Sequence, residues 1–224
     1  MKPLDEVARD FDLIAGALRA LPSSDALTPA EKSLLLHVPA GVRRAIDVGC
    51  GDGRFARALA HRGLHVTAVD LSPVMLELAR ERTDASLSIE FREGDIMTGS
   101  LADGAYDLVT SISMVHHLPL SEVVPRLARL VAPGGTLLIQ DVTQRDGLRY
   151  FASNILAGAR SHLRRLLQRR FHSRDVAVLY SEHGQGERYL AASDVEREYR
   201  RLLPSARAIN HLEWRYTIVW VAGA

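Results

Sequence analysis

The sequence predicts an α/β fold, a doubly wound and mostly parallel sheet with helices on both faces. Three observations predict it. Short runs rich in Val and Ile alternate with helical patterns between residues 44 and 142. A single helix separates most neighbouring runs, as parallel βαβ units with right-handed crossovers require. The first run leads into a glycine-rich turn that opens a helix, AIDVGCGDGRFA at 45–56.

Length and composition place the chain among globular proteins that bury one sizeable core. It has 224 residues, of which 47% are hydrophobic and 25% charged, with a net charge of +1. These values exclude a disordered chain and do not point to a polyanionic partner. Cys50 is the single cysteine, so no intrachain disulfide can form. Acidic residues interrupt the N-terminus and every apolar run is shorter than a membrane span, so we expect a cytoplasmic protein without a signal peptide.

Two cap helices are expected in residues 1–38, ahead of the sheet. The first covers about residues 5–20 and the second residues 29–36. The first has apolar residues at helical spacing, which are Val7, Phe11, Ile14 and Leu18. Thr28 is placed as the N-cap of the second helix, with Pro29 at its first position.

Residues 40–142 form the expected core, in which strands and helices alternate. The predicted strands lie at 44–49, 65–70, 87–95 (continuing as a loop), 106–113 and 136–142. The predicted helices lie at 54–63, 72–83 and 121–135. Ser72 caps the second of these helices, while Gly63 and Gly134 are expected to end the first and the third.

The pattern changes after Val142, although no linker is long enough to divide the chain into two domains. Residues 143–193 predict an insert with a long helix at 148–171 and a polar loop at 180–190. Residues 194–224 predict a helix, at 193–204 with its cap, and two strands at 206–214 and 216–222. Because no helix separates these strands, they can pair directly, so at least one should run antiparallel to the rest of the sheet.

The glycine-rich turn predicts a binding site for a nucleoside. Gly49, Gly51 and Gly53 lie between a strand and a helix, where an open α/β sheet binds ligands. The next strand ends in Asp70, 21 residues after Gly49, at the place where a carboxylate can bind ribose hydroxyls. Arg54 departs from the dinucleotide pattern, which has its third glycine there.

Four segments in order resemble the class I S-adenosylmethionine-dependent methyltransferases of the small bacterial type. They are AIDVGCGDG at 45–53, VTAVDLSPVMLELAR at 66–80, REGDIM at 92–97, and YDLVTSISMVHHL at 106–118 followed by RLVAPGGTLLIQD at 129–141. The resemblance covers about residues 40–142. It implies a seven-stranded sheet whose last strand is inserted antiparallel, and it implies S-adenosyl-L-methionine as the cofactor.

The same resemblance implies roles for particular residues. Those at the amino-acid end of the cofactor would be Asp47, Gly49, Cys50 and Gly51. Asp70 would accept both ribose hydroxyls and Leu71 would pack on the adenine. Asp95 would accept the adenine amino group beside Ile96, and Ser111 and Ile112 would lie next to the methionine part. The helix that contains Phe11 would close over the cofactor.

Methyl transfer from a sulfonium is an in-line displacement, so the protein must align the acceptor and exclude water. A base is needed where the acceptor is a hydroxyl that loses its proton. His116 or His117, after the fourth core strand, is the candidate, with Asp141 as a second choice; both histidines could equally be structural. Cys50 is interpreted as a small filler rather than a nucleophile. No set of residues has metal-ligand spacing, so we expect no metal.

The acceptor should be selected by residues 143–193. Six arginines lie between Arg160 and Arg174 with no acidic residue among them. In order of preference, they form the solvated face of a helix, a lid that attracts an acidic small molecule, or a basic surface for nucleic acid or membrane. The preferred acceptor is a small molecule and no nucleic acid is expected. Peripheral membrane contact through 148–174 and a lipid-soluble quinone stay open, as does the oligomeric state.

The sequence therefore predicts a methyltransferase that acts on O or N of a small molecule. Two alternatives belong to other classes of protein. One is an NAD(P)-dependent oxidoreductase, which is disfavoured because Arg54 replaces the third glycine of the dinucleotide pattern. The other is a binding module that holds the cofactor without catalysis.

Overall fold

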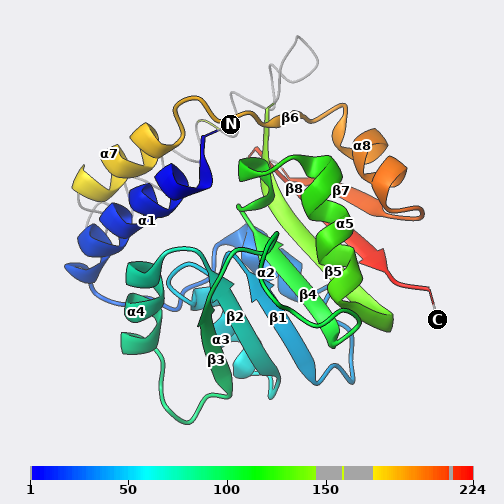
Figure 1. The fold of residues 1–224 in the computed structure, drawn as a ribbon, viewed down its shortest axis with the longest axis horizontal. Coiled ribbons are helices and arrows are strands. Elements are labelled where there is room, and N and C mark those ends of the chain that lie inside the picture. Colours follow the sequence, from blue (N-terminus) through cyan, green and yellow to red (C-terminus); the bar gives the residue numbers. More distant parts are fainter. Residues whose placement is uncertain (1, 145–157, 159–173, 212–213, 224) are drawn as a thin grey trace.

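A central sheet of parallel strands organises the computed structural model, which describes residues 2–144, 158, 174–211 and 214–223 (Figure 1). The strands are β1 Arg44–Val48, β2 His65–Asp70, β3 Ile89–Glu93, β4 Tyr106–Ile112, β5 Val131–Gln144, β6 Leu190–Ala191, β7 Arg207–His211 and β8 Arg215–Val221. Their order is β3-β2-β1-β4-β5-β8-β7, with the short β6 beside the end of β5.

The direction of the strands confirms the predicted topology. Strands β1 to β5 pair in parallel, whereas β8 is inserted antiparallel between β5 and β7. The seven strands on this path correspond to the seven that the sequence predicts. The two-residue β6, parallel to β5, was not predicted. It overlaps the segment 180–190, of which only the last residue belongs to the strand.

Helices cover both faces of the sheet and the edge at which its parallel strands end (Figure 1). They are α1 Leu4–Arg19, α2 Pro29–Leu35, α3 Arg54–Ala60, α4 Pro73–Glu81, the short η1 Val115–His117, α5 Leu120–Leu130, α7 Arg174–His183 and α8 Val195–Leu202. Apolar side chains of α5 and α8 pack on one face and those of α2 and α3 on the other. A third cluster joins α1 and α4, with Leu179 of α7 packed against it.

Local signals explain where several helices begin. The hydroxyl of Thr28 accepts the backbone N–H of Glu31, whose carboxylate accepts the N–H of Thr28 in return, so this pair is a capping box. Ser72 accepts the N–H of Met75 at 2.9 Å and caps α4. Both caps are where the sequence predicts them.

Two predicted boundaries are wrong. The helix expected at 121–135 ends at Leu130, because Val131 already pairs with Tyr106 as the first residue of β5. Gly134 therefore does not end a helix but lies within β5, at an irregularity in its pairing with β4. The loop expected at 180–190 begins inside α7, which reaches His183 because the buried Val176 and the packed Leu179 hold this helix against its neighbours.

The helix predicted at 148–171 and most of the arginine-rich segment lie outside the described residues. Among the helices that the structure does describe, none has both the length and the apolar composition needed to cross a bilayer.

Candidate functional site

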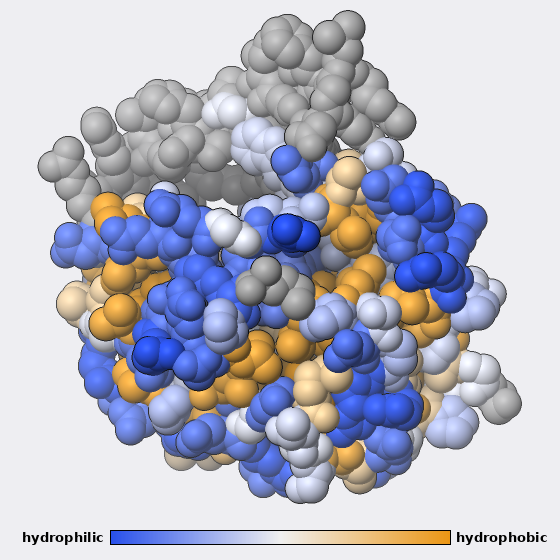
Figure 2. All heavy atoms as spheres, turned by 45° about the horizontal axis from the view of Figure 1, so that its top comes forward, coloured by the Kyte–Doolittle hydropathy of each residue, from blue (hydrophilic) through white to orange (hydrophobic). Residues whose placement is uncertain are grey.

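A cavity of about 560 Å³ opens where the parallel strands β1, β2 and β4 end. Its floor consists of the glycine-rich turn and the ends of these strands. Its walls come from the loop after β3, from η1, and from α1 and α7, which contribute Phe11 and Val176. In Figure 2, which tilts the top of Figure 1 forward, patches of hydrophobic side chains appear between hydrophilic ones on the coloured surface. The cavity therefore has the position at which open α/β sheets bind ligands.

The glycine-rich turn wraps closely around the end of β2. Gly49 and Cys50 donate their backbone N–H groups to the carbonyl of Val69, at 2.8 and 3.1 Å. Gly49 has φ +73°, and a Cβ built there would lie 2.7 Å from Cγ of Met114. Gly51 has φ +54° and only open space where its Cβ would project. The turn thus leaves bare backbone beside the cavity, as the sequence predicts.

Asp70 closes this turn from the end of the neighbouring strand. Its Oδ2 accepts the N–H of Gly51 at 2.8 Å, and its Oδ1 accepts the N–H of Ser72 at 3.0 Å. Burial raises the pKa of Asp70, and these backbone hydrogen bonds oppose the shift. Each oxygen keeps a lone pair that these two bonds do not use, so the carboxylate can still accept hydroxyls. Leu71 follows it on the cavity wall.

Asp47, near the end of β1, is buried below the turn and also lines the cavity. Its Oδ1 accepts the hydroxyl of Thr110 at 2.7 Å. Burial raises the pKa of Asp47 to about 7, and the charges of Asp70 and Glu31 act in the same direction. A buried carboxylate of this kind is stabilised by any cation that enters the cavity.

The remaining predicted cofactor residues lie around the cavity, with one exception. Asp95 and Ile96 line it from the loop after β3, and the carboxylate of Asp95 accepts the N–H of Met97 at 2.8 Å. Ile112 lines it from the end of β4. Ser111 does not line the cavity: it is fully buried, because successive side chains of a strand point to opposite faces. Burial raises the pKa of the Cys50 thiol, which fits its interpretation as a filler.

His116 and Asp141 form a buried pair at the far side of the cavity. The Nδ1 of His116 lies 2.7 Å from Oδ1 of Asp141, and the backbone N–H of His116 donates to Oδ2 of the same carboxylate at 3.0 Å. The side chain of His116 is 10% exposed and that of Asp141 is fully buried. Since Nδ1 is held by the carboxylate, Nε2 is the nitrogen left to take a proton from the cavity.

His117 lies in a different environment, although it is the next residue. Its Nδ1 is 3.2 Å from Oε1 of Glu187, and its ring contacts those of Phe11 and His183. Burial lowers the pKa of His117 to about 2, with a further contribution from His116. His117 is thus a much weaker base than an ordinary imidazole.

Sequence reasoning named Asp141, the partner of His116, but missed the residues around His117. Glu187 and His183 come from the segment after α7 and from its last turn, and Asp10 comes from α1. His183 and Asp10 are joined at 3.0 Å although they are 173 residues apart in sequence. No local motif in the sequence points to them, because only the packing of α7 against α1 brings them together.

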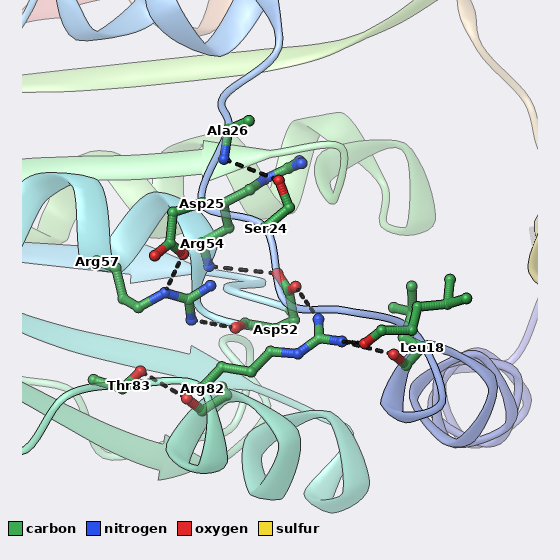
Figure 3. Close-up of polar contacts among 12 residues, drawn as sticks. Leu18, Ser24, Asp25, Ala26, Asp52, Arg54, Arg57, Arg82 and Thr83 are labelled. Carbon is green, nitrogen blue, oxygen red and sulfur yellow. Dashed lines mark hydrogen bonds and ion pairs between the residues drawn. The ribbon is translucent and has the colours of Figure 1, made fainter. Parts of the chain in front are cut away.

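A network of charged side chains fixes α1 beside the glycine-rich turn (Figure 3). Arg82 donates to Oδ2 of Asp52 at 2.7 Å and to the carbonyl of Leu18, near the end of α1, at 2.6 Å. Arg57 donates to the backbone carbonyl of Asp52 and to the carboxylate of Asp25, each at 2.7 Å. The wall that α1 gives to the cavity is therefore tied to its floor.

The sequence of this chain is similar to those of known methyltransferases. A family model described as a methyltransferase domain matches residues 46–139. An uncharacterised methyltransferase of Mycobacterium tuberculosis is 40% identical over 125 residues, covering 54% of this chain and 63% of that protein. A ubiquinone biosynthesis O-methyltransferase of Bordetella avium is 34% identical over 143 residues, covering 62% and 58%. The chain thus spans less than two thirds of the length of these relatives.

Solved structures share the fold at low sequence identity. Phosphoethanolamine N-methyltransferase 2 of Haemonchus contortus, solved with phosphomonomethylethanolamine and S-adenosylhomocysteine, superposes with a TM-score of 0.68. It is 18% identical, and the match covers 97% of this chain and 60% of that one. The likeness confirms the open sheet with its final antiparallel strand. None of these matches favours the oxidoreductase alternative.

Proposed function

We propose that the chain is a class I S-adenosylmethionine-dependent methyltransferase that methylates a small molecule on O or N, as the methyltransferase-domain match over residues 46–139 and the similar methyltransferases support. Of these two acceptor atoms, we favour the oxygen of a hydroxyl group. The observation that carries this choice is the pair of His116 and Asp141, in which His116 lines the same cavity as the glycine-rich turn and Asp141 lies directly behind it.

The residues at one end of the cavity fit S-adenosylmethionine. Open space at Gly51 leaves its backbone accessible, and the unused lone pairs of Asp70 suit two ribose hydroxyls. Asp47 would hold the ammonium group of the amino-acid part, and Asp95 would accept the adenine amino group. When bound, this cofactor supplies a methyl group that its sulfonium already activates. Ser111 is the one predicted contact that we do not retain, because it lies outside the cavity lining.

His116 is the candidate general base for a hydroxyl acceptor. Asp141 holds its Nδ1–H, fixes the tautomer and stabilises the imidazolium that forms when Nε2 takes a proton. His117 suits this role less well, since burial holds its pKa at about 2. The two adjacent histidines thus have different surroundings: His116 is held by the carboxylate of Asp141, whereas burial makes His117 a weak base.

The walls of the cavity suit an acceptor with an apolar body. Phe11, Val7 and Val176 line it from α1 and α7, and Leu118 and Met114 from the segment after β4. Such walls exclude water from the reacting atoms and align a ring or chain that carries the hydroxyl. A hydroxylated aromatic or quinol is the acceptor class that combines these properties, and one relative is named a ubiquinone biosynthesis O-methyltransferase.

Cofactor binding is tested first. Thermal unfolding should shift upward with S-adenosylhomocysteine and stay unchanged with NADH, since a ligand stabilises the state that binds it. The reverse result would restore the oxidoreductase alternative, and no shift with either ligand would refute the cofactor assignment.

Transfer is tested next, with labelled S-adenosylmethionine and a panel of phenols and quinols. His116→Gln should lower kcat by about a hundredfold or more, the contribution typical of a general base, with a smaller change in KM. It should also remove the rise of kcat with pH. His61→Gln, which changes an exposed histidine, is the matched control and should behave as the unmodified protein. Equal rates for the two variants would show that His116 is not the base.

A further inference from the structure

Three side chains that can ligate a metal ion converge beside the acceptor end of the cavity. They are His117 of η1, His183 in the last turn of α7, and Glu187 in the segment that follows. One ligand atom from each lies within 4.8 Å of the others. The side chains are deeply buried, with exposures of 5% for His117, 7% for His183 and 0% for Glu187.

Each of these side chains keeps a polar atom without a hydrogen-bond partner among the described residues. The atoms are Nε2 of His117, Nε2 of His183 and Oε2 of Glu187. Buried polar groups are nearly always hydrogen-bonded, because an unpaired one carries the full cost of its desolvation. Three such atoms in one cluster therefore indicate that something else fills their bonding capacity.

The surroundings of His183 resemble the outer shell of a metal site. Its Nδ1 lies 3.0 Å from Oδ2 of Asp10, which also accepts the ammonium of Lys2 at 2.8 Å. A histidine that ligates a metal through one nitrogen commonly donates its other N–H to a carboxylate, which fixes the ring. Asp10 holds Nδ1 in this way and leaves Nε2 as the ligand atom.

The charge and the donor types agree with a divalent cation. Around the imidazoles of His117 and His183 there are two carboxylates, Asp10 and Glu187, and one ammonium group, that of Lys2. The rings of His116 and Tyr189 pack beside this cluster. Two imidazole nitrogens and one carboxylate oxygen form a donor set typical of Zn²⁺ and unlike the all-oxygen sets of Mg²⁺ or Ca²⁺.

We propose that His117, His183 and Glu187 bind a divalent transition-metal ion, for which Zn²⁺ is the reference. Bonds of about 2.1 Å in a tetrahedral site place ligand atoms about 3.4 Å apart. The candidate ligand atoms now lie within 4.8 Å of one another, so a modest contraction brings them to this spacing, and the hydrogen bond from the His117 ring to Glu187 already holds two of the side chains together. His183 approaches by a small rotation of its side chain or of α7, so the ion draws α7 toward η1.

Metal binding would act on the cavity in two ways. It would fasten α7, whose Val176 and Tyr180 form part of the wall, to the core. Three protein ligands also leave a fourth position, and His117 and His183 both line the cavity. A hydroxyl that takes this position would lose its proton more readily. This second effect rests on the proposed methyltransferase function, whereas binding of the ion does not.

Zinc binding is measured on tag-free protein that has been treated with a chelator, by calorimetry without cofactor. We expect about one Zn²⁺ per chain with a submicromolar Kd, and a rise in Tm on addition of the ion. Glu187→Gln and His183→Asn should each weaken binding at least a hundredfold. Asp10→Asn, which changes the outer shell, should weaken it by about ten- to a hundredfold. His61→Asn, at an exposed site outside the cluster, is the matched control and should bind as the unmodified protein does.

Circular dichroism establishes whether each variant is folded. If His183→Asn does not fold, Glu187→Gln still tests the site, because glutamine has the same size as glutamate. Zinc affinity that is the same in Glu187→Gln as in the control, or absence of binding in the unmodified protein, would overturn the proposal. Titration with S-adenosylhomocysteine is run in parallel. Loss of cofactor binding with zinc binding intact refutes the proposed function alone, and the opposite result refutes the metal site alone.

Discussion

Asp47→Asn should stabilise the ligand-free protein at neutral pH and remove a pH dependence of its stability. The carboxyl is buried at the floor of the cavity, and burial raises its pKa from 3.8 to about 7. The folded chain therefore holds this proton more tightly than the unfolded chain does. Because the folded pKa is the higher one, the contribution of Asp47 to stability is greatest at acid pH and falls as pH rises from about 4 to about 7.

The size of the effect follows from the two pKa values. Each tenfold change in a dissociation constant corresponds to about 1.4 kcal/mol, so complete ionisation of Asp47 costs about 4 kcal/mol of folding free energy. This is a large fraction of the stability of a typical domain. An asparagine at this position would have no charge to bury, and its carbonyl oxygen could still accept the hydroxyl of Thr110.

The assay is urea unfolding of both proteins between about pH 4 and about pH 7.5, without ligand. Their difference in free energy reports Asp47 together with its repulsion from Asp70, because the burial of Asp70 itself is common to both proteins and cancels. The variant should gain on the unmodified protein as pH rises. A difference that does not change with pH would refute the reasoning, since it would mean that Asp47 ionises in the folded protein as it does in water.

Three further substitutions test other parts of the structure. Asp70→Ala removes the acceptor of two backbone N–H groups beside the cavity, so calorimetry should show S-adenosylhomocysteine affinity lower by about 1 to 3 kcal/mol; an unchanged Kd would remove Asp70 from the site. Arg82→Met leaves the carbonyl of Leu18 without its hydrogen bond and should lower the free energy of unfolding in urea by about 2 kcal/mol. A loss smaller than the experimental error would show that this hydrogen bond does not stabilise the fold. Tyr199→Phe leaves the buried hydroxyl of Tyr216 without its partner at 3.0 Å and should cost about 1 to 3 kcal/mol; the double Phe variant should recover part of this loss, and strict additivity would contradict the pairing.

Much of the fold follows from local signals in the sequence. Thr28 and Ser72 mark the starts of α2 and α4 because their hydroxyls accept backbone N–H groups that a helix leaves unpaired. The antiparallel pair at the C-terminus follows from the absence of a helix between two apolar runs. The end of α5 at Leu130 could not be predicted in this way, because the pairing of Val131 with β4 overrides the preference of Gly134 to end a helix.

The candidate site likewise contains residues that the sequence predicts and residues that only tertiary packing brings together. Eleven of the twelve predicted site residues line one cavity, because the ends of parallel strands meet at one edge of the sheet. Ser111 does not, because its side chain points away from the cavity into the core. The sequence alone does not show which residues of β4 point to which side. The cluster of His117, His183 and Glu187 also escaped prediction. Its residues have no common spacing, and the packing of α7 on α1 alone brings them together.

Three carboxylates on parallel strands of the sheet show how one residue type can have different surroundings around one cavity. Asp47 has a single hydroxyl as its hydrogen-bond partner, which opposes the effect of burial without outweighing it, so the pKa of Asp47 rises to about 7. Asp70 has two backbone N–H groups, which support its anionic form and leave lone pairs for hydroxyls. Asp141 has the ring of His116, which it orients through the contact with Nδ1. Because β1, β2 and β5 fix these partners before any ligand enters, the strand order itself separates the end proposed to bind the cofactor from the end proposed to accept a proton.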